Sequence, residues 1–195
     1  MTRIAIALFD GAEELDWAGP WEVLAAWSKQ WPDDDVEVFT VARTSDVVTC
    51  AKGLRVVPDR GWAEAGEVDV LVYPGGRGTR TELKDDAVLE WLRSLRTDGT
   101  LMTSVCTGSL VYAAAGFLRD RAATTYWGSL DLLRELDSSI DVRADDRFVD
   151  SGEIVTAAGV SAGIDMALHL VARLHSVERA REVRRYIQYD PEPPV

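Results

Sequence analysis

Short apolar runs rich in β-branched residues alternate with longer segments in which apolar residues recur at a helical period, and this alternation restricts the fold more than any other feature of the sequence. The pattern is typical of α/β proteins, in which a mostly parallel sheet carries helices on both faces. The runs that we predict as strands are residues 3–9, 36–42, 68–73, 100–105, 141–149 and 154–157. A β-hairpin is expected at 47–57, with Gly53 near its middle and Cys50 inside it.

Start and stop signals mark the expected helices. Pro20 is expected in the first turn of a helix, where proline is favoured. Ser161 is expected to cap a later helix over 161–175. The predicted apolar stripe of that helix consists of Ile164, Ala167, Leu168, Val171 and Leu174. The other helices are predicted at residues 85–96, 107–115, 129–136 and 177–189.

Length and composition agree with a single folded domain. The chain has 195 residues, of which 47% are hydrophobic and 28% charged, as in an ordinary globular protein. The sequence contains no internal repeat, low-complexity tract or linker-like segment. We therefore expect residues 1–195 to form one domain.

The charge balance argues against nucleic-acid binding. The net charge of −12 arises from 21 Lys and Arg residues against 33 Asp and Glu residues, and such a surface repels phosphate backbones. No stretch approaches the roughly 20 apolar residues of a membrane helix, and the apolar run at 4–9 is too short for a secretory signal. We expect a cytoplasmic location, no membrane association, and two reduced cysteines, Cys50 and Cys106.

The segment from Leu101 to Leu110 changes from an extended run to helix-favouring residues at Cys106. Only a sharp turn fits there, and Gly108 allows the backbones to approach closely. At a helix N-terminus the pKa of the Cys106 thiol is expected to be lowered, and the Thr107 N–H is expected to donate to an oxyanion. The alternative is a small buried cysteine at a strand end. Cys50, in the predicted hairpin, is expected to be structural.

Two glycines follow the neighbouring strand, in the sequence Pro74-Gly75-Gly76. Ligands of open parallel sheets bind beyond the carboxyl ends of the strands, so this loop and Cys106 are expected to share one mouth. The N–H groups of Gly75 and Gly76 are candidate oxyanion donors, and a plain loop is the alternative. Neither a Walker pattern nor G-x-G-x-x-G is present, so nucleotide binding is not indicated.

A catalytic thiol usually needs a partner acid or base. His169 and His175 are the two histidines, and their spacing places them on different faces of one helix. We expect both to be structural and predict no metal site. Asp16 belongs to a group of carboxylates that follow the first strand, on the side of the sheet where Cys106 is expected. A helix N-cap is the alternative role for Asp16.

Several segments occur in an order typical of one family. They are FDGAEELD at 9–16, GP at 19–20 with EVL at 22–24, YPGG at 73–76, SVCTGS at 104–109, ATTYW at 123–127 and AGVSAGID at 158–165. Together they resemble the ThiJ/PfpI family of the class I glutamine amidotransferase-like superfamily. The resemblance implies a flavodoxin-like three-layer sandwich, a homodimer, Cys106 on a nucleophile elbow, and a hydrogen bond from Asp16 to the Cys106 sulfur.

The details resemble the isonitrile hydratase branch of that family. They are an aspartate at position 16, Cys-Thr-Gly at the elbow, ATTYW, and a YDPEPP ending at 189–194. The resemblance implies a cofactor-free conversion of isonitriles, as small-molecule substrates, to N-substituted formamides. Cys106 would attack the substrate, Asp16 would donate a proton, and Thr107 would position substrate or water. Tyr126 and Trp127 are candidates for the substrate-binding wall, and Trp17 and Trp21 are further aromatic candidates.

Two departures from the family pattern bear on function. Protease-like members carry histidine where Thr107 stands, so peptidase activity is not expected. Many members carry histidine where Tyr126 stands, which leaves the substrate open. The alternatives are a glyoxalase III-like or deglycase-like enzyme acting on reactive dicarbonyls, and a redox-sensing small-molecule-binding module in which Cys106 is oxidised.

Overall fold

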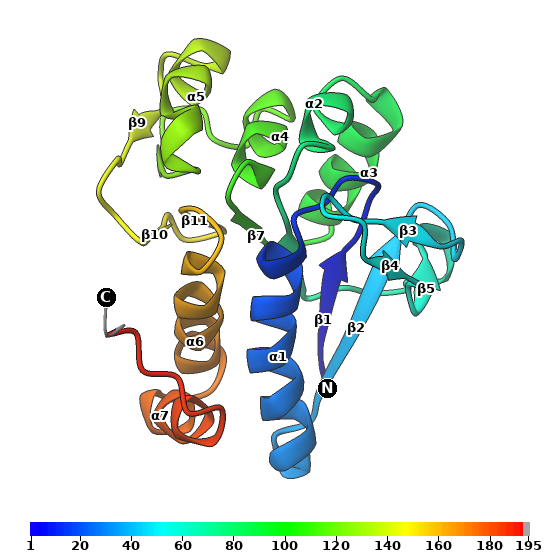
Figure 1. Cartoon of the computed structure of the whole chain (residues 1–195), viewed down its shortest axis with the longest axis vertical. Helices are drawn as coiled ribbons and strands as arrows, with labels where there is room; N and C mark the ends of the chain where they lie inside the picture. Colours follow the sequence, from blue (N-terminus) through cyan, green and yellow to red (C-terminus); the bar gives the residue numbers. More distant parts are fainter. Residues whose placement is uncertain (193–195) are drawn as a thin grey trace.

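A seven-stranded sheet with the order β10-β11-β7-β6-β1-β2-β5 forms the centre of the computed structural model, which describes residues 1–192 (Figure 1). Neighbouring strands run parallel except at one edge, where β10 pairs antiparallel with β11. The strands are β1 (Thr2–Ala7), β2 (Val36–Ala42), β5 (Arg60–Gly61), β6 (Val70–Tyr73), β7 (Leu101–Val105), β10 (Phe148–Asp150) and β11 (Ile154–Ala157). The last two residues of the YDPEPP ending lie outside the described residues.

Three strands near the middle of the sheet, β6, β7 and β11, are buried along their whole length. A parallel strand covered on both faces needs apolar residues at every position rather than at alternate ones. This explains the largely apolar runs, in which the small polar residues Thr103, Ser104 and Thr156 are buried as well. The strands predicted near residues 68–73, 100–105 and 154–157 are confirmed.

Helices cover both faces of the sheet. The chain steps from β1 to β2 in one direction along the sheet and from β6 to β7 in the other. Because such crossovers are right-handed, the connecting helices α1 (Glu14–Gln30) and α3 (Asp86–Thr97) lie on opposite faces. The other helices are α2 (Thr79–Glu82), α4 (Gly108–Ala114), α5 (Leu130–Leu136), α6 (Ala162–Leu174) and α7 (Val177–Tyr186). The predicted flavodoxin-like three-layer sandwich is confirmed.

Glycines allow α1 and α6 to lie side by side on one face (Figure 1). A β-carbon on Gly19 would lie 3.0 Å from Cγ1 of Ile164, and one on Gly163 would lie 3.1 Å from Cγ of Pro20. A β-carbon on Gly163 would also lie 3.1 Å from Cγ2 of Val105, the last residue of β7. The small residues therefore fix α6 against the strand that leads to Cys106.

The buried face of α6 differs from the predicted stripe. Its buried residues are Ala162, Gly163, Met166, Ala167, Leu170 and Val171. Of the predicted stripe, Ile164 and Leu168 are half-buried and Leu174 is exposed. The predicted stripe left out Gly163, Met166 and Leu170, because the face of α6 that is buried is set by the close contact of Gly163 with Pro20 of α1 and Val105 of β7. Ser161 makes no side-chain capping bond.

Two further boundaries differ from the prediction. Helix α1 begins at Glu14, so Pro20 lies in its second turn rather than its first, and its missing N–H leaves the Asp16 carbonyl without the usual helical bond. The predicted strand 141–149 is two strands, β9 (Asp141–Val142) and β10, which belong to different sheets. Strand β9 pairs with β8 (Ala122–Ala123) outside the central sheet.

The predicted hairpin at 47–57 is confirmed as the two-stranded sheet of β3 (Val48–Thr49) and β4 (Arg55–Val56). Backbone bonds attach it to the loop after β1: the Gly11 N–H donates to the Thr49 carbonyl at 2.8 Å, and the Ala51 N–H donates to the Ala12 carbonyl at 2.8 Å. The hairpin is therefore a fixed wall beside the carboxyl end of β1.

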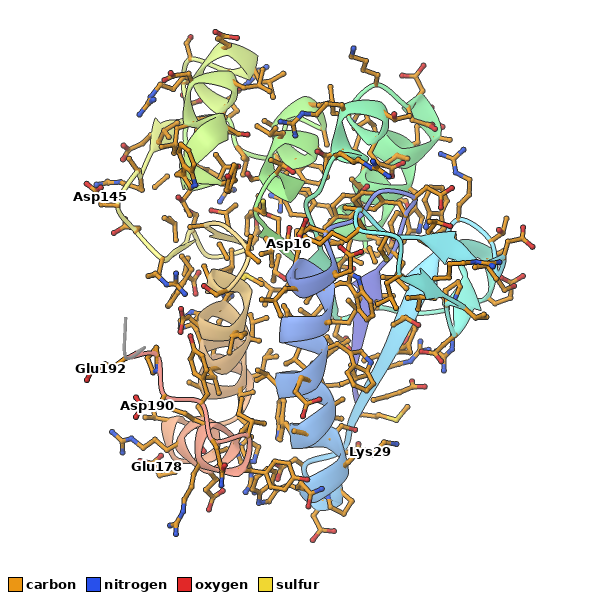
Figure 2. The ribbon with its side chains drawn as sticks, in the orientation of Figure 1. Asp16, Lys29, Asp145, Glu178, Asp190 and Glu192 are labelled. Carbon is orange, nitrogen blue, oxygen red and sulfur yellow. The ribbon has the colours of Figure 1, made fainter. Side chains whose placement is uncertain are left out.

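Helix α1 runs from the middle of the molecule, where Asp16 lies, to the lower end, where Lys29 lies (Figure 2). Asp16 lies at the end nearest α2 and α4, among the loops that follow β1, β6 and β7, whereas Lys29 lies at the other end. Within residues 1–192, no helix combines the length and apolar character needed to cross a membrane.

Candidate active site

Cys106 lies on a sharp turn between β7 and α4, as predicted. Its φ of 56° is in the left-handed region, which costs an L-residue about 1–2 kcal/mol. Neighbouring groups hold the turn: the Cys106 N–H donates to the Ala158 carbonyl at 2.9 Å, and the Cys106 carbonyl accepts from Oγ1 of Thr125 at 2.9 Å. The backbone at this cysteine has the geometry of a nucleophile elbow.

The loop after β6 packs directly on this elbow. A β-carbon on Gly108 would lie 2.5 Å from the Tyr73 carbonyl oxygen, and one on Gly75 would lie 2.5 Å from the Thr107 nitrogen. Both distances are too short for any side chain, so only glycine allows the two loops to meet. The expectation that the Pro74-Gly75-Gly76 loop and Cys106 share one mouth is confirmed.

Asp16 is the acidic partner of Cys106. It is the third residue of α1, so the N-cap alternative does not hold, and its side chain is fully buried. Oδ2 of Asp16 accepts from the Gly75 N–H at 2.9 Å. Oδ1 accepts no conventional N–H or O–H bond within residues 1–192, and the Cys106 thiol interacts with this same carboxyl.

Burial sets the acidity of both groups. Burial raises the pKa of Asp16 to about 7, against the hydrogen bonds from Gly75 and Cys106 that favour its charged form. Burial, and then the charge of Asp16, raises the pKa of Cys106 to about 12. The predicted lowering of the thiol pKa was therefore wrong, because the removal of water outweighs the N–H groups of Thr107 and Val160 that stabilise a thiolate.

The pair can exchange a proton during a reaction. Above about pH 7 it holds one proton, with the sulfur as a thiol beside an Asp16 carboxylate. A carboxylate placed in this way accepts the proton as sulfur attacks an electrophile and can return it in a later step. The geometry therefore gives the Cys106 thiol a neighbouring proton acceptor rather than a resting thiolate.

The N–H groups of Gly75 and Gly76 do not serve as oxyanion donors. Gly75 donates to Asp16, and the Gly76 N–H donates to Oγ1 of Thr107 at 3.0 Å. The prediction failed because these amides already have partners on the neighbouring loops. Their role is to fix Asp16 and Thr107 beside Cys106.

Val160 is a site residue that sequence reasoning missed. Its φ of 45° is a rare conformation for a β-branched residue. The strained turn follows β11, and its backbone N–H joins that of Thr107 in stabilising negative charge on the Cys106 sulfur. The AGVSAGID segment was the available signal, but its strained residue cannot be identified from residue types alone.

A pocket of about 500 Å³ opens above Cys106. Its lining comes from the loops after β1, β6, β7, β8 and β11 and from the hairpin: Glu13, Lys52, Gly76, Arg77, Arg80, Cys106, Thr107, Tyr126, Gly128, Ser129 and Val160. Sequence reasoning missed the three basic residues and Ser129, because no local pattern placed them near the elbow.

Of the aromatic residues predicted to line the substrate site, one lines the pocket and the others do not. Tyr126 lines the pocket, and its ring lies between two glycines: a β-carbon on Gly128 or Gly159 would lie within 2.9 Å of it. Trp127 is 75% exposed and does not line this pocket. Of the other aromatic candidates, Trp17 is buried in the core and Trp21 is exposed. The prediction of a tryptophan wall was therefore wrong, because these indoles point into the core or outward.

The remaining candidates lie outside the pocket. His169 contacts Asp150 at 2.7 Å and His175 contacts Asp34 at 3.2 Å, in agreement with structural roles. Cys50 is free and buried, and burial raises its pKa. Within residues 1–192, no group of three or more His, Cys, Asp and Glu side chains is arranged to hold a metal ion.

The fold and the elbow define a class: flavodoxin-like α/β proteins with a cysteine on a sharp turn after a central strand. Residues 2–173 match the DJ-1/PfpI family model, and this chain belongs to that family.

Individual relatives agree with this membership. The chain is 38% identical over 192 residues to an isonitrile hydratase from Pseudomonas putida, covering 98% of this chain and 80% of the relative. It is 26% identical over 150 residues to the glutathione-independent glyoxalase DJR-1.2 from Caenorhabditis elegans, covering 76% and 78%. The crystal structure of a ThiJ/PfpI family protein from Pseudomonas syringae matches with a TM-score of 0.88 and 30% identity, covering 100% of this chain and 77% of that one.

Proposed function

We propose that this protein is a cofactor-free, cysteine-dependent hydratase that converts isonitriles to N-substituted formamides. The observation that carries the proposal is the buried Cys106–Asp16 pair at the floor of an open pocket, with threonine rather than histidine after the cysteine. Similarity to the isonitrile hydratase from Pseudomonas putida over 98% of this chain supports the same reaction.

The first step joins sulfur to the terminal carbon of R–N≡C. Asp16 takes the thiol proton as the S–C bond forms, and then gives that proton to the same carbon. The product is the thioimidate R–N=CH–S–Cys106, and Asp16 returns to its carboxylate form. One proton has moved from sulfur to carbon, so no cofactor is needed to balance the step. A group with a pKa near 7 suits both proton transfers.

The second step consumes one water molecule. The water oxygen bonds to the thioimidate carbon, and Asp16 takes one proton from that water. Asp16 then passes the proton to the nitrogen, which gives R–NH–CH(OH)–S–Cys106. The C–S bond then breaks, the hydroxyl proton returns to sulfur, and R–NH–CHO leaves. The N–H groups of Thr107 and Val160, which face the sulfur, are the donors available to the transient oxygen charge.

Thr107 and Tyr126 shape the reaction space. The Thr107 hydroxyl is held by the Gly76 N–H at 3.0 Å and by the Thr79 hydroxyl at 3.1 Å, so it has a fixed direction beside Cys106. Tyr126 is held by the flanking glycines and offers a ring face to the substrate. In this proposal Thr107 positions substrate or water, and Tyr126 packs against the R group.

The test follows formamide production from cyclohexyl and phenyl isocyanide. Cys106→Ser and Cys106→Ala are expected to abolish turnover with an unchanged unfolding transition, because sulfur forms the covalent bond. Asp16→Asn is expected to lower kcat by about 10²–10⁴-fold, because it keeps the shape but cannot carry the proton. Cys50→Ser is the matched control, a second buried thiol outside the pocket, and it should retain activity. Near-normal turnover by Cys106→Ala would refute the mechanism.

A dicarbonyl-handling activity is the second candidate, because the chain is also similar to the glyoxalase DJR-1.2 over 76% of its length. Methylglyoxal supplied in place of the isonitrile decides between the two. Conversion of methylglyoxal at a kcat/KM above that for both isocyanides would favour this candidate. A redox-sensing role is less favoured, because thiols with a raised pKa oxidise slowly.

We further propose that residues 1–195 act as one domain of a cytoplasmic homodimer, as the family resemblance implies. The family match over 2–173 supports a single domain. Sedimentation equilibrium of the purified chain would test the dimer, and a monomer at micromolar concentration would contradict it.

A further inference from the structure

The rim of the pocket above Cys106 is basic, although the protein carries a net charge of −12. Its ionisable lining consists of Lys52, Arg77, Arg80 and one carboxylate, Glu13. Lys52 forms an ion pair with Glu13 and lies 3.8 Å from Glu14, so its charge is neutralised within the protein. Two arginine charges remain at the mouth of the pocket, whereas the carboxyl of Asp16 is buried beneath Cys106.

Neither arginine is neutralised by the protein. Within residues 1–192, no carboxylate lies within 4 Å of Arg77 or Arg80, whereas many other arginines of the chain have acidic partners. An arginine that lines a pocket without an acidic partner is available for an anion from outside, and its planar fork fits a carboxylate.

Arg80 is the better placed of the two. Its Nη1 donates to the Thr79 hydroxyl at 3.0 Å, and its Nη2 approaches the Ser129 hydroxyl at 3.4 Å. These two contacts leave three of the five guanidinium N–H groups without a partner among the described residues. Thr79 and Ser129 are buried, so Arg80 is held from beneath and its remaining donors are free to meet a ligand.

The same contacts connect Arg80 to the reacting residues. The Thr79 hydroxyl lies 3.1 Å from Oγ1 of Thr107, the residue after Cys106. Arg80 and Cys106 line the same pocket, so one small molecule can touch both. Arg77 makes no side-chain hydrogen bond or ion pair within the described residues and has no comparable anchor.

We propose that Arg80 binds a carboxylate on the substrate, so that the preferred substrates are small anionic isonitriles whose reactive carbon reaches Cys106. This inference rests on the proposed hydratase function and adds the substrate class. Arg80 is then a specificity-determining residue: it binds the non-reacting end of the substrate while Cys106 and Asp16 act at the other end.

The first experiment compares two isonitriles that differ only in charge, isocyanoacetate and its methyl ester. For the wild type we expect kcat/KM to be at least fivefold higher for the acid than for the ester. Arg80→Gln should lower this acid-to-ester ratio about five- to tenfold, and Arg80→Lys should restore part of it. The preference should shrink at 0.5 M NaCl, because salt screens a charge at a pocket mouth.

Lys84→Gln is the matched control. Lys84 follows the end of α2, four residues after Arg80 and outside this pocket, and the substitution removes the same charge. It should leave the acid-to-ester ratio unchanged, which separates a local contact from a general change in charge. Urea unfolding curves for each variant check that Arg80→Gln folds normally.

The second experiment needs no turnover. Cys106 is alkylated with iodoacetate or iodoacetamide, which share a reaction but differ in charge, and labelling is followed at Cys106 and Cys50 by peptide mass spectrometry. The rate with iodoacetate is divided by the rate with iodoacetamide, and this ratio is normalised to the same ratio measured for glutathione. At Cys106 the normalised ratio should be about five or more in the wild type and near one in Arg80→Gln. At buried Cys50 the normalised ratio should stay near one in both.

The outcomes separate the two proposals. An Arg80-dependent preference for iodoacetate with no turnover of either isonitrile would support the anion site and overturn the hydratase function. Turnover of both isonitriles with an acid-to-ester ratio of one or less, or a ratio that Arg80→Gln does not change, would support the hydratase and overturn the anion site. A normalised alkylation ratio of one in the wild type would also overturn the anion site.

Discussion

Asp16 combines two properties that usually exclude each other: it is fully buried, and it titrates near the pH at which cells work. Burial raises its pKa because the charged form loses hydration, while the Gly75 N–H and the Cys106 thiol keep ionisation within reach. A carboxyl near the surface would be ionised at all relevant pH values and would make a weaker base. The buried position therefore suits this carboxyl to the proton transfers that we propose for it.

The pH dependence of turnover follows from Asp16. Because its carboxylate accepts the thiol proton, kcat/KM for an isocyanide should rise with pH and level off above about pH 7. Measurement of kcat/KM between pH 5 and 9 checks this. In Asp16→Asn the residual rate should lack that rise, and a profile identical to the wild type would remove Asp16 from the reaction.

Stability should show the opposite trend. The folded pKa of about 7 lies above the unfolded value near 4, so the folded state binds more protons in this range. The contribution of Asp16 to stability is therefore present below about pH 4 and is lost as the pH rises to about 7. At pH 8 the folded wild type must keep a charged carboxylate buried, whereas asparagine is neutral. Asp16→Asn should therefore raise the free energy of unfolding at pH 8 by about 2–4 kcal/mol relative to wild type. Urea unfolding at pH 4.5 should show a much smaller difference, and equal differences at both pH values would contradict the assignment.

At the scale of elements, the site depends on loops that meet through glycine. Gly75→Ala is expected to reduce activity by more than 100-fold and to destabilise the fold. Its β-carbon would lie 2.5 Å from the Thr107 nitrogen and 2.8 Å from Oδ2 of Asp16, so the loop after β6 would have to move. Formamide production and urea unfolding measure the two effects.

Gly152→Ala is the control for Gly75→Ala. Gly152 has a φ of 85° and nothing within 4 Å of a β-carbon, and it lies outside the pocket. It should lose about 1 kcal/mol of stability through backbone strain and keep its activity. If both variants kept full activity, the close packing of the two loops would not matter for catalysis.

Element prediction from sequence succeeded where the signal was local. The buried strands gave largely apolar runs, and the helical period at 85–96 gave α3. The structure adds that Asp85 caps this helix and accepts from the Ala87 N–H at 3.0 Å. Prediction failed where the outcome depended on distant neighbours. The face of α6 was decided by Gly19 on α1, and the roles of the Gly75 and Gly76 amides were decided by Asp16 and Thr107.

The site residues also fall into those that local motifs predicted and those that only the tertiary structure reveals. Cys106, Asp16 and Thr107 were identified from motifs, because each follows a strand in a recognisable segment. Lys52 and Arg80 reach the pocket only through the hairpin and α2, which pack beside the elbow by tertiary contacts. The acidity of Cys106 was also beyond sequence reasoning, because desolvation is a property of the folded environment.

At the scale of the whole molecule, one carboxylate connects distant ends of the chain. Asp34, in the turn after α1, accepts from Arg179 of α7 at 2.6 and 3.0 Å and from Nε1 of Trp27 at 2.6 Å. Burial opposes its charge, but the hydrogen bonds from Arg179 and Trp27 hold the pKa of Asp34 below its usual range. This cluster attaches α7 to the first helix.

Asp34→Asn should lower the free energy of unfolding by about 2 kcal/mol at pH 7, because it leaves Arg179 without its main partner. Because the folded pKa is lowered, this stabilisation is present above the unfolded pKa and is lost as pH falls through the folded one. Urea unfolding measures the loss. Asp131→Asn, which breaks a pair whose carboxylate is 92% exposed, should change stability by less than about 0.5 kcal/mol. Equal effects of the two variants would refute the anchoring role of Asp34.

The burial of Cys50 and Cys106 also has a consequence for ageing of the protein. Inside the folded molecule burial raises the pKa of both thiols, so little thiolate is present for an oxidant to attack. Heat that opens the chain releases two thiols of ordinary acidity, free to cross-link with one another or between molecules. Thermal inactivation in air should therefore become irreversible through oxidation, and a reductant added before heating should preserve the capacity to refold.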